Sequence, residues 1–142
     1  PSLSQEILGQ YQSRPEPADR YSLADHPNVA AGGPMQGLFE ALRKEIVALD
    51  PAVTEEFFKV YIAYKAETNF VDVAAQAGRL RLWLNMGFDD LQDPRGLAKD
   101  VSQIGHHGNG DVEVSIRDHE NLPYVMGLIR QSLEQQLANV VD

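Results

Sequence analysis

The stretch "KVYIAYKAETNFVDVAAQAGRLRLWLNM", residues 59–86, decides the fold class because it is rich in β-branched and aromatic residues. Turn-type pairs at Thr68-Asn69 and Ala77-Gly78 divide this stretch into shorter segments. The division predicts three strands, near residues 59–66, 69–75 and 79–85. No crossover helix separates these strands, so the stretch predicts an antiparallel sheet.

Alternation is clearest in the third predicted strand. Its leucines, Leu80, Leu82 and Leu84, are predicted to face one side of the sheet. The opposite side is predicted to present Arg79, Arg81, Trp83 and Asn85. A period of two is typical of a half-buried antiparallel strand, so the leucine side should face a hydrophobic core.

Two helices are predicted on either side of the strands. A helix starting near Met35 and ended by Asp50-Pro51 has apolar residues three and four positions apart, namely Leu38, Phe39, Leu42, Ile46 and Leu49. The following segment "PAVTEEF" is predicted to add a further helical turn. A second helix, from about residue 121 to 139, has an apolar stripe consisting of Leu122, Val125, Met126, Ile129, Leu133 and Leu137.

A long connection, residues 87–110, precedes the fourth predicted strand. The connection is broken at Asp93-Pro94 and Gly96, and its segment "LAKDVSQI" is predicted to be a short helix. The strand "DVEVSIRD" should bury its valines and isoleucine. It is predicted to expose Asp111, Glu113, Ser115 and Arg117.

Together these elements predict a two-layer α+β domain over residues 35–142. An antiparallel sheet of about four strands should pack against N- and C-terminal helices. Residues 1–34 are rich in proline and glycine, which predicts a linker or N-terminal arm with a short helical piece at residues 3–11. The segment "YSLADHP" is expected to lie across the domain, anchored by Tyr21 and Leu23.

Charge and composition narrow the classes of partner. The chain has 142 residues, a formal net charge of −9 and no cysteine, which excludes disulfides and thiolate metal sites. Nucleic-acid binding depends on neutralising phosphates, so it is expected only through neighbouring domains or a local Arg/Trp patch. No apolar run is long enough to cross a bilayer, and we expect a cytoplasmic protein. Because the chain begins with Pro1, we expect it to be part of a longer protein.

The segment "GHHGNG", residues 105–110, allows several interpretations. His106 and His107 are adjacent, and adjacent side chains in extended backbone point to opposite faces, so no metal site is predicted. The glycines permit an anion-binding nest, but the segment leads into a strand that contains Asp111. We therefore predict a turn, with Asn109 followed by Gly110 at a positive φ angle. A binding loop remains the alternative.

The side of the sheet opposite the leucines is the predicted binding face. It carries Arg79, Arg81, Trp83, Glu113 and Arg117, and arginine and tryptophan are typical anchors of interfaces. The alternative is that the N-terminal arm covers Trp83. The loop adds the binding candidates His106, His107, Asn109 and Asp111. No serine combines with a histidine and a carboxylate, so no catalytic residue and no cofactor is predicted.

Four segments, "LFEALRKEIVALDPAVTEEF", "VYIAYKAETNFVDVAAQAGRLRLWLNM", "DPRGLAKDV" and "GHHGNGDVEVSI", together resemble a bacterial family of unknown function. Its members are often labelled "predicted transport protein", and the resemblance covers about residues 36–137. The family usually has an aromatic residue, typically tryptophan, where this chain has His107.

The resemblance also implies a domain context. Family members occur at the C-terminus of large nucleases that resemble modification-dependent restriction enzymes, with a ParB-like nuclease domain followed by an HNH-type domain. We therefore expect a non-catalytic accessory or interaction domain of a bacterial nucleic-acid-targeting defence protein. Its partner would be another protein, the parent nuclease chain or a small ligand. The alternative is a small enzyme or a nucleotide- or nucleic-acid-binding module that uses residues 105–110 and the adjacent sheet.

Overall fold

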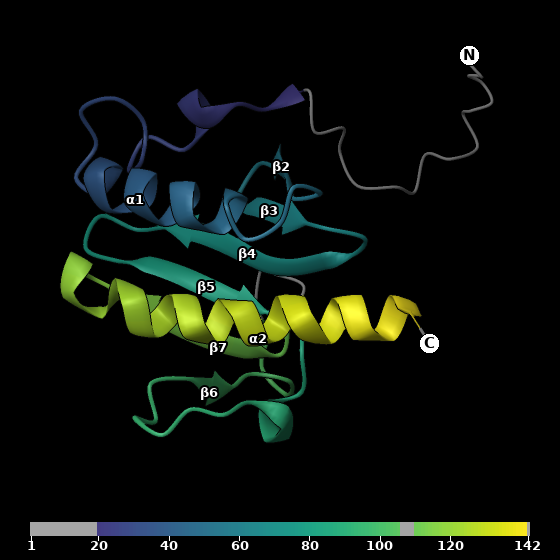
Figure 1. Cartoon of the computed structure of the whole chain (residues 1–142). Helices are drawn as coiled ribbons and strands as arrows, with labels where there is room; N and C mark the ends of the chain where they lie inside the picture. Colours follow the sequence, from purple (N-terminus) through teal and green to yellow (C-terminus); the bar gives the residue numbers. More distant parts are fainter. Residues whose placement is uncertain (1–19, 106–109, 142) are drawn as a thin grey trace, which may run out of the picture.

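A six-stranded antiparallel sheet, covered on one face by two helices, forms the protein (Figure 1). The computed structural model describes residues 20–105 and 110–141. The strands lie in the order β2-β3-β4-β5-β7-β6. Their bounds are β2 Thr54–Phe57, β3 Ile62–Lys65, β4 Asn69–Ala75, β5 Leu80–Leu84, β6 Lys99–Asp100 and β7 Val112–Ile116. The helices are α1 Gln36–Val47 and α2 Leu122–Val141, with short 3-10 turns η3 Leu23–Asp25, η4 Phe88–Asp90 and η5 His119–Asn121.

The predicted α+β class and antiparallel pairing are confirmed, but the sheet has six strands where about four were predicted. The predicted helical turn over "PAVTEEF" is wrong, because residues 54–57 pair with β3 as β2. A tight turn, in which the Phe58 N–H donates to the Tyr61 carbonyl over 2.9 Å, joins β2 to β3. The first predicted strand, over residues 59–66, therefore becomes regular strand only at Ile62.

The predicted helix over "LAKDVSQI" is also wrong. Residues 99–100 pair with β7 as β6, and the Val101 N–H donates to the Asp111 carbonyl over 2.8 Å. Carboxylates compete locally for the backbone donors of this segment, since Asp93 accepts from the Ala98 N–H and Asp100 from the Ser102 N–H. Such side-chain bonds offer the backbone an alternative to a helix.

The hydrophobic core lies between the sheet and the helices. Leu80, Leu82 and Leu84 are fully buried there, as their alternation predicts. The predicted stripes of both helices supply most of the facing side chains, namely Leu38, Phe39, Leu42, Ile46, Leu122, Val125, Met126, Ile129 and Leu133. A buried hydroxyl ties the layers together, because Ser132 Oγ of α2 donates to the Phe70 carbonyl of β4 over 2.6 Å.

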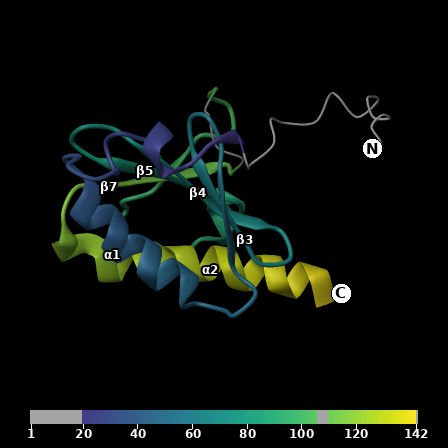
Figure 2. The same ribbon diagram turned by 90° about the horizontal axis from the view of Figure 1, so that it is seen from above.

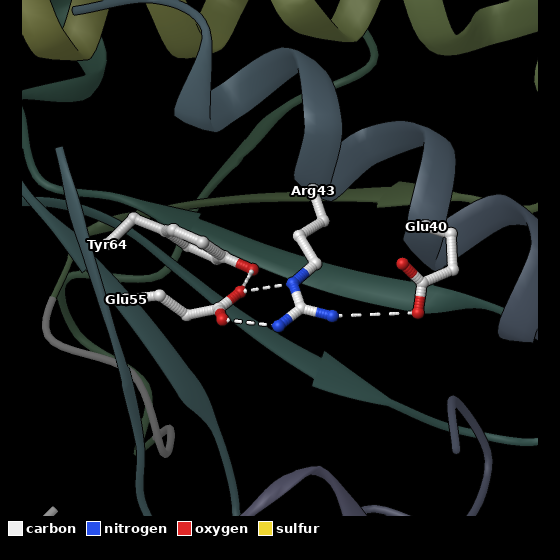
Figure 3. Close-up of polar contacts among 4 residues, drawn as sticks. All are labelled: Glu40, Arg43, Glu55 and Tyr64. Carbon is white, nitrogen blue, oxygen red and sulfur yellow. Dashed lines mark hydrogen bonds and ion pairs between the residues drawn. The ribbon is translucent and has the colours of Figure 1, made fainter. Parts of the chain in front are cut away.

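A polar clamp joins α1 to β2 and β3 (Figure 3). The guanidinium of Arg43 donates to both carboxylate oxygens of Glu55, over 2.8 Å and 2.7 Å, and the Tyr64 hydroxyl donates to Glu55 over 2.7 Å. Glu40 adds a longer ion pair to Arg43 at 3.6 Å. Burial raises the pKa of Tyr64 above its usual value of 10.0, and the neighbouring Glu55 charge raises it further. Bidentate pairs of this kind fix geometry, so the clamp orients α1 over the sheet.

Residues 20–28 lie on the face of the sheet opposite the helices, as Figure 2 shows. His26 Nε2–H donates to the Phe58 carbonyl over 2.8 Å, and Asn28 Nδ2–H donates to the Ala75 carbonyl over 3.3 Å. Val29 is fully buried and joins the hydrophobic core. The predicted anchors Tyr21 and Leu23 are partly exposed, so His26 and Val29 are the most buried residues of this segment. The helical piece predicted at residues 3–11 lies outside the described residues.

Candidate functional site

The face of the sheet that the helices leave uncovered contains most of the predicted binding residues. Strand register places one row of side chains across all six strands: Glu56, Ala63, Asp72, Trp83, Glu113 and Lys99. The neighbouring row consists of Ala74, Arg81 and Ser115. We call this surface the second face of the sheet.

The centre of the second face is buried, which corrects the predicted exposure of Glu113 and, of the two alternatives for Trp83, favours the one in which the segment before α1 covers it. Trp83 and Asp72 are 0 % exposed, and Glu113 is 4 % exposed. Residues 25–28 and 59–60 line a hollow of about 310 Å³ together with Arg81 and Trp83. The segment before α1 and the turn after β2 therefore lie beside Trp83. Strand β5 is covered by the core on one face and by these segments at Trp83 on the other.

Arg81, Trp83 and Glu113 form one interacting group. Arg81 donates to both Glu113 oxygens, over 3.1 Å and 2.9 Å, and its guanidinium carbon lies 5.1 Å from the centre of the Trp83 ring. Burial alone would raise the pKa of Glu113, but the Arg81 bonds and charge and the nearby charge of Lys99 hold it below its usual value. The Trp83 indole N–H also lowers this pKa. Glu113 is consequently ionised at neutral pH, and both of its carboxylate oxygens are bonded to Arg81.

Beside this group, a hollow of about 240 Å³ opens on the second face. It is lined by Arg79, Leu97, Lys99, Glu113, Ser115 and Arg117, and we call it the basic hollow. Arg79 donates to neutral partners, to Gln76 over 2.6 Å and to Ser115 Oγ over 3.1 Å. Within the described part of the chain, no ion pair is formed by Arg79, Lys99 or Arg117. The basic hollow thus gathers three positive charges around one carboxylate, Glu113, which is already bonded to Arg81.

The structure separates the predicted site residues into several places. Arg79, Glu113 and Arg117 line the basic hollow, whereas Arg81 and Trp83 line the hollow beside residues 25–28. Asp111 lies apart from them, in a third hollow with Asp89, Asp90 and Asp100. His106, His107 and Asn109 lie outside the described residues. Lys99 and Leu97 were missed as site residues because their segment was predicted to be helical.

The predicted positive φ angle of Gly110 is wrong. Positive φ angles occur at Gly32 and Gly96, with values of 82° and 65°. A Cβ atom added at Gly110 would lie 2.1 Å from the Leu84 carbonyl oxygen. Position 110 requires glycine because two backbones approach each other closely there, and not because of a positive φ angle. The Asn-Gly pair in the sequence does not reveal this close approach.

Among residues 20–105 and 110–141, no group of three or more potential ligands is placed to hold a metal ion.

Comparison with known families then assigns the chain. A family model described as "Domain of unknown function (DUF5655)" matches residues 28–136, from just before the buried Val29 to the last turns of α2. The chain belongs to the DUF5655 family. The predicted membership of a family of unknown function is confirmed. In the part of this DUF5655 chain that the structure describes, no helix has both the length and the apolarity needed to cross a bilayer.

One relative places the DUF5655 domain within a longer sequence. An uncharacterized protein of Haemophilus influenzae is 40 % identical to this chain over 100 residues. The aligned region covers 70 % of this chain but 33 % of the relative, so the chain matches about a third of that protein's length. No solved structure matches the chain.

The buried His26 makes a pH-dependent prediction for this DUF5655 domain. Burial lowers the pKa of His26 below its usual value of 6.5, and the bond to Phe58 and the charge of Asp25 only partly offset this effect. The unfolded chain therefore binds a proton first as the pH falls through about 6.5, so the free energy of unfolding should decrease on acidification. The variant His26→Gln removes this contribution. Its loss of stability from about pH 7.5 to about pH 5 should be smaller than that of the wild type.

Urea unfolding at a series of pH values measures this difference. Carboxylate titration is common to both proteins and cancels in the comparison. Identical pH profiles for the wild type and His26→Gln would contradict the assignment of His26 as a buried, neutral side chain.

Proposed function

We propose that this DUF5655 domain is a non-catalytic accessory domain of a longer bacterial protein and that it binds its partner through the second face of its sheet. The observation that carries the proposal is the gathering of Arg79, Lys99 and Arg117 around one hollow, in a chain whose formal net charge is −9. Clustering of basic side chains on an acidic protein creates a local field that attracts an acidic or anionic partner.

The state of the titratable groups supports a binding role over catalysis. A general acid or base needs access to substrate and a pKa near the working pH. Glu113 is buried, bonded to Arg81 and has a lowered pKa. Asp93 accepts hydrogen bonds from Tyr124 and from the Ala98 N–H, and burial, which would raise its pKa, is outweighed by these bonds. Both carboxylates therefore serve to hold segments of the fold together.

We further propose that the parent protein is a nucleic-acid-targeting defence protein. The resemblance to C-terminal domains of modification-dependent restriction nucleases supports this context. The match to a third of a bacterial relative is consistent with a domain that works within a longer chain. In such a protein, other domains would contact and cleave nucleic acid in the cytoplasm. This domain would contact the parent chain or an associated protein.

The alternative function, a small enzyme, is separated from the accessory role by a turnover assay on the 142-residue chain. The purified chain is incubated with magnesium and either plasmid DNA or a nucleoside triphosphate. Neither substrate should be converted faster than in buffer. Turnover that is lost in Asp111→Asn, but kept in the control Asp118→Asn, which follows the other end of β7, would establish the enzyme and refute the accessory role.

Partner binding is tested separately with the remainder of the parent protein, supplied as its own polypeptide. The wild-type chain should co-purify with it. The charge-reversed variant Arg117→Glu should not, while Arg130→Glu, at an exposed position of α2, should bind like the wild type. Equal binding by all three proteins would show that the second face is not the binding surface.

A further inference from the structure

We infer that the basic hollow is a binding site for the phosphate group of a small ligand such as a nucleotide. This inference rests on the proposed use of the second face for binding and adds the class of ligand.

The first observation is a pair of like charges at neighbouring positions on two strands. Leu80 pairs with Ile116, and continuing this antiparallel register by one residue places Arg79 opposite Arg117. Both arginines line the basic hollow. Like charges directly opposite each other destabilise a sheet. An anion bound between them would convert this repulsion into two attractive contacts.

The second observation is the set of hydrogen-bond donors. Guanidinium groups present planar forks that match phosphate oxygens, and an ammonium group adds a point charge. Arg79 and Arg117 supply the forks, and Lys99 supplies the ammonium group. Ser115 accepts a hydrogen bond from Arg79 over 3.1 Å, which holds that guanidinium in place and leaves the hydroxyl proton available for a ligand oxygen.

The single carboxylate of the hollow does not oppose an anion strongly. Glu113 is 4 % exposed and both of its oxygens accept from Arg81, at 3.1 Å and 2.9 Å. Its charge is therefore already compensated. The three cations of the hollow outnumber it, so the local balance of charge is positive while the whole chain is acidic.

Size and polarity favour a small ligand over a long polyanion. The hollow measures about 240 Å³. Leu97 lines it and has 38 % of its surface exposed. An exposed leucine beside a phosphate site suits a sugar or base attached to that phosphate. A long nucleic acid would extend beyond the hollow over a protein whose formal net charge is −9, which opposes its approach.

The test uses the 142-residue chain and three probes: inorganic phosphate, adenosine monophosphate and a short duplex DNA. The variant of the basic hollow, called the hollow variant, combines Arg79→Gln with Arg117→Gln. The control variant combines Lys44→Gln with Arg130→Gln, which changes the net charge equally but at exposed positions of α1 and α2. Calorimetric titration gives the dissociation constant of each probe, and thermal unfolding gives an independent readout, because a ligand that binds the folded state raises Tm.

Adenosine monophosphate should bind the wild type and the control variant with equal affinity. It should bind the hollow variant at least about tenfold more weakly. Inorganic phosphate should show the same order with lower affinity. Without ligand, the hollow variant should be about as stable as the wild type, because removal of the repulsive pair offsets the loss of the Arg79 bonds to Gln76 and Ser115. The single variant Arg79→Lys keeps the charge and loses the fork, so it should bind with intermediate affinity and gives a second measurement.

Three outcomes would overturn the inference. Equal weakening in the control variant would show that only net charge matters. Tight, steeply salt-dependent binding of the duplex, with weak binding of the nucleotide, would assign the phosphate to nucleic acid instead of a small ligand. An absence of binding by all three probes would show that the hollow holds no phosphate. In that last case partner binding by the wild-type chain would leave the accessory function standing, so the two proposals fail separately.

Discussion

Replacing Gly110 with alanine is expected to lower the free energy of unfolding by about 3 kcal/mol. A Cβ atom at this position would lie 2.1 Å from the carbonyl oxygen and 2.3 Å from the carbonyl carbon of Leu84. It would also lie 2.8 Å from the Asn85 amide nitrogen. All three atoms belong to the backbone, which cannot rotate aside as a flexible side chain can. The start of β7 must therefore move away from the end of β5.

Chemical denaturation of the alanine variant measures this loss. Gly78→Ala is a suitable control, since Gly78 has no atom within 4 Å of an added Cβ and no positive φ angle. Gly33→Ala should resemble Gly110→Ala, because its Cβ would lie 2.3 Å from the Pro27 carbonyl oxygen. A Gly110→Ala variant as stable as Gly78→Ala would show that β5 and β7 approach less closely at this point.

Replacing Trp83 with alanine is expected to cost about 4 kcal/mol. Trp83 is 0 % exposed and lies in the register between Asp72 and Glu113, both of which are also buried. Its ring supports the guanidinium of Arg81 at 5.1 Å. Removal of the indole leaves a cavity among charged groups, so the loss combines packing with weaker compensation of the buried carboxylates.

The variant Trp83→Phe separates these contributions. Phenylalanine keeps most of the apolar volume and loses the indole N–H that lowers the pKa of Glu113. Its cost should be about 1–2 kcal/mol, well below that of alanine. Because Trp83 is the sole tryptophan of the chain, unfolding of these variants is followed by circular dichroism and not by fluorescence. A loss below about 1 kcal/mol for Trp83→Ala would contradict its burial on the second face.

Long elements with a clear period were predictable from sequence. Leu80, Leu82 and Leu84 occupy every second position, and the stripe from Leu38 to Ile46 repeats every three to four residues. In both cases the element is buried on the side that faces the core between the sheet and the helices, so its own sequence period shows which side chains are buried. The strands β2 and β6, of four and two residues, are too short to show a period. Their conformation depends on pairing with β3 and β7, which a local pattern does not contain.

The candidate site was predicted only in part, for a similar reason. Alternation correctly placed Arg79 and Arg117 on the face opposite the core. It also suggested that Glu113 faces solvent, because a polar position in an alternating strand normally does so, and it left open whether the N-terminal arm covers Trp83. Here other segments cover the centre of that face, and Arg81 compensates the charge of Glu113. Burial of this kind depends on distant parts of the chain, as does the constraint on Gly110.

The outermost strands have a consequence for self-association. Among the described residues, β2 and β6 end the sheet, and an unpaired strand edge is a template for further strands. β6 offers two residues, Lys99 and Asp100, both exposed and charged. β2 contains Glu55, held by Arg43, and Glu56, held by Lys65 at 3.1 Å. Short, charged edges oppose the addition of a strand from another molecule, so two such sheets resist merging into a fibril even when copies of the domain are crowded together.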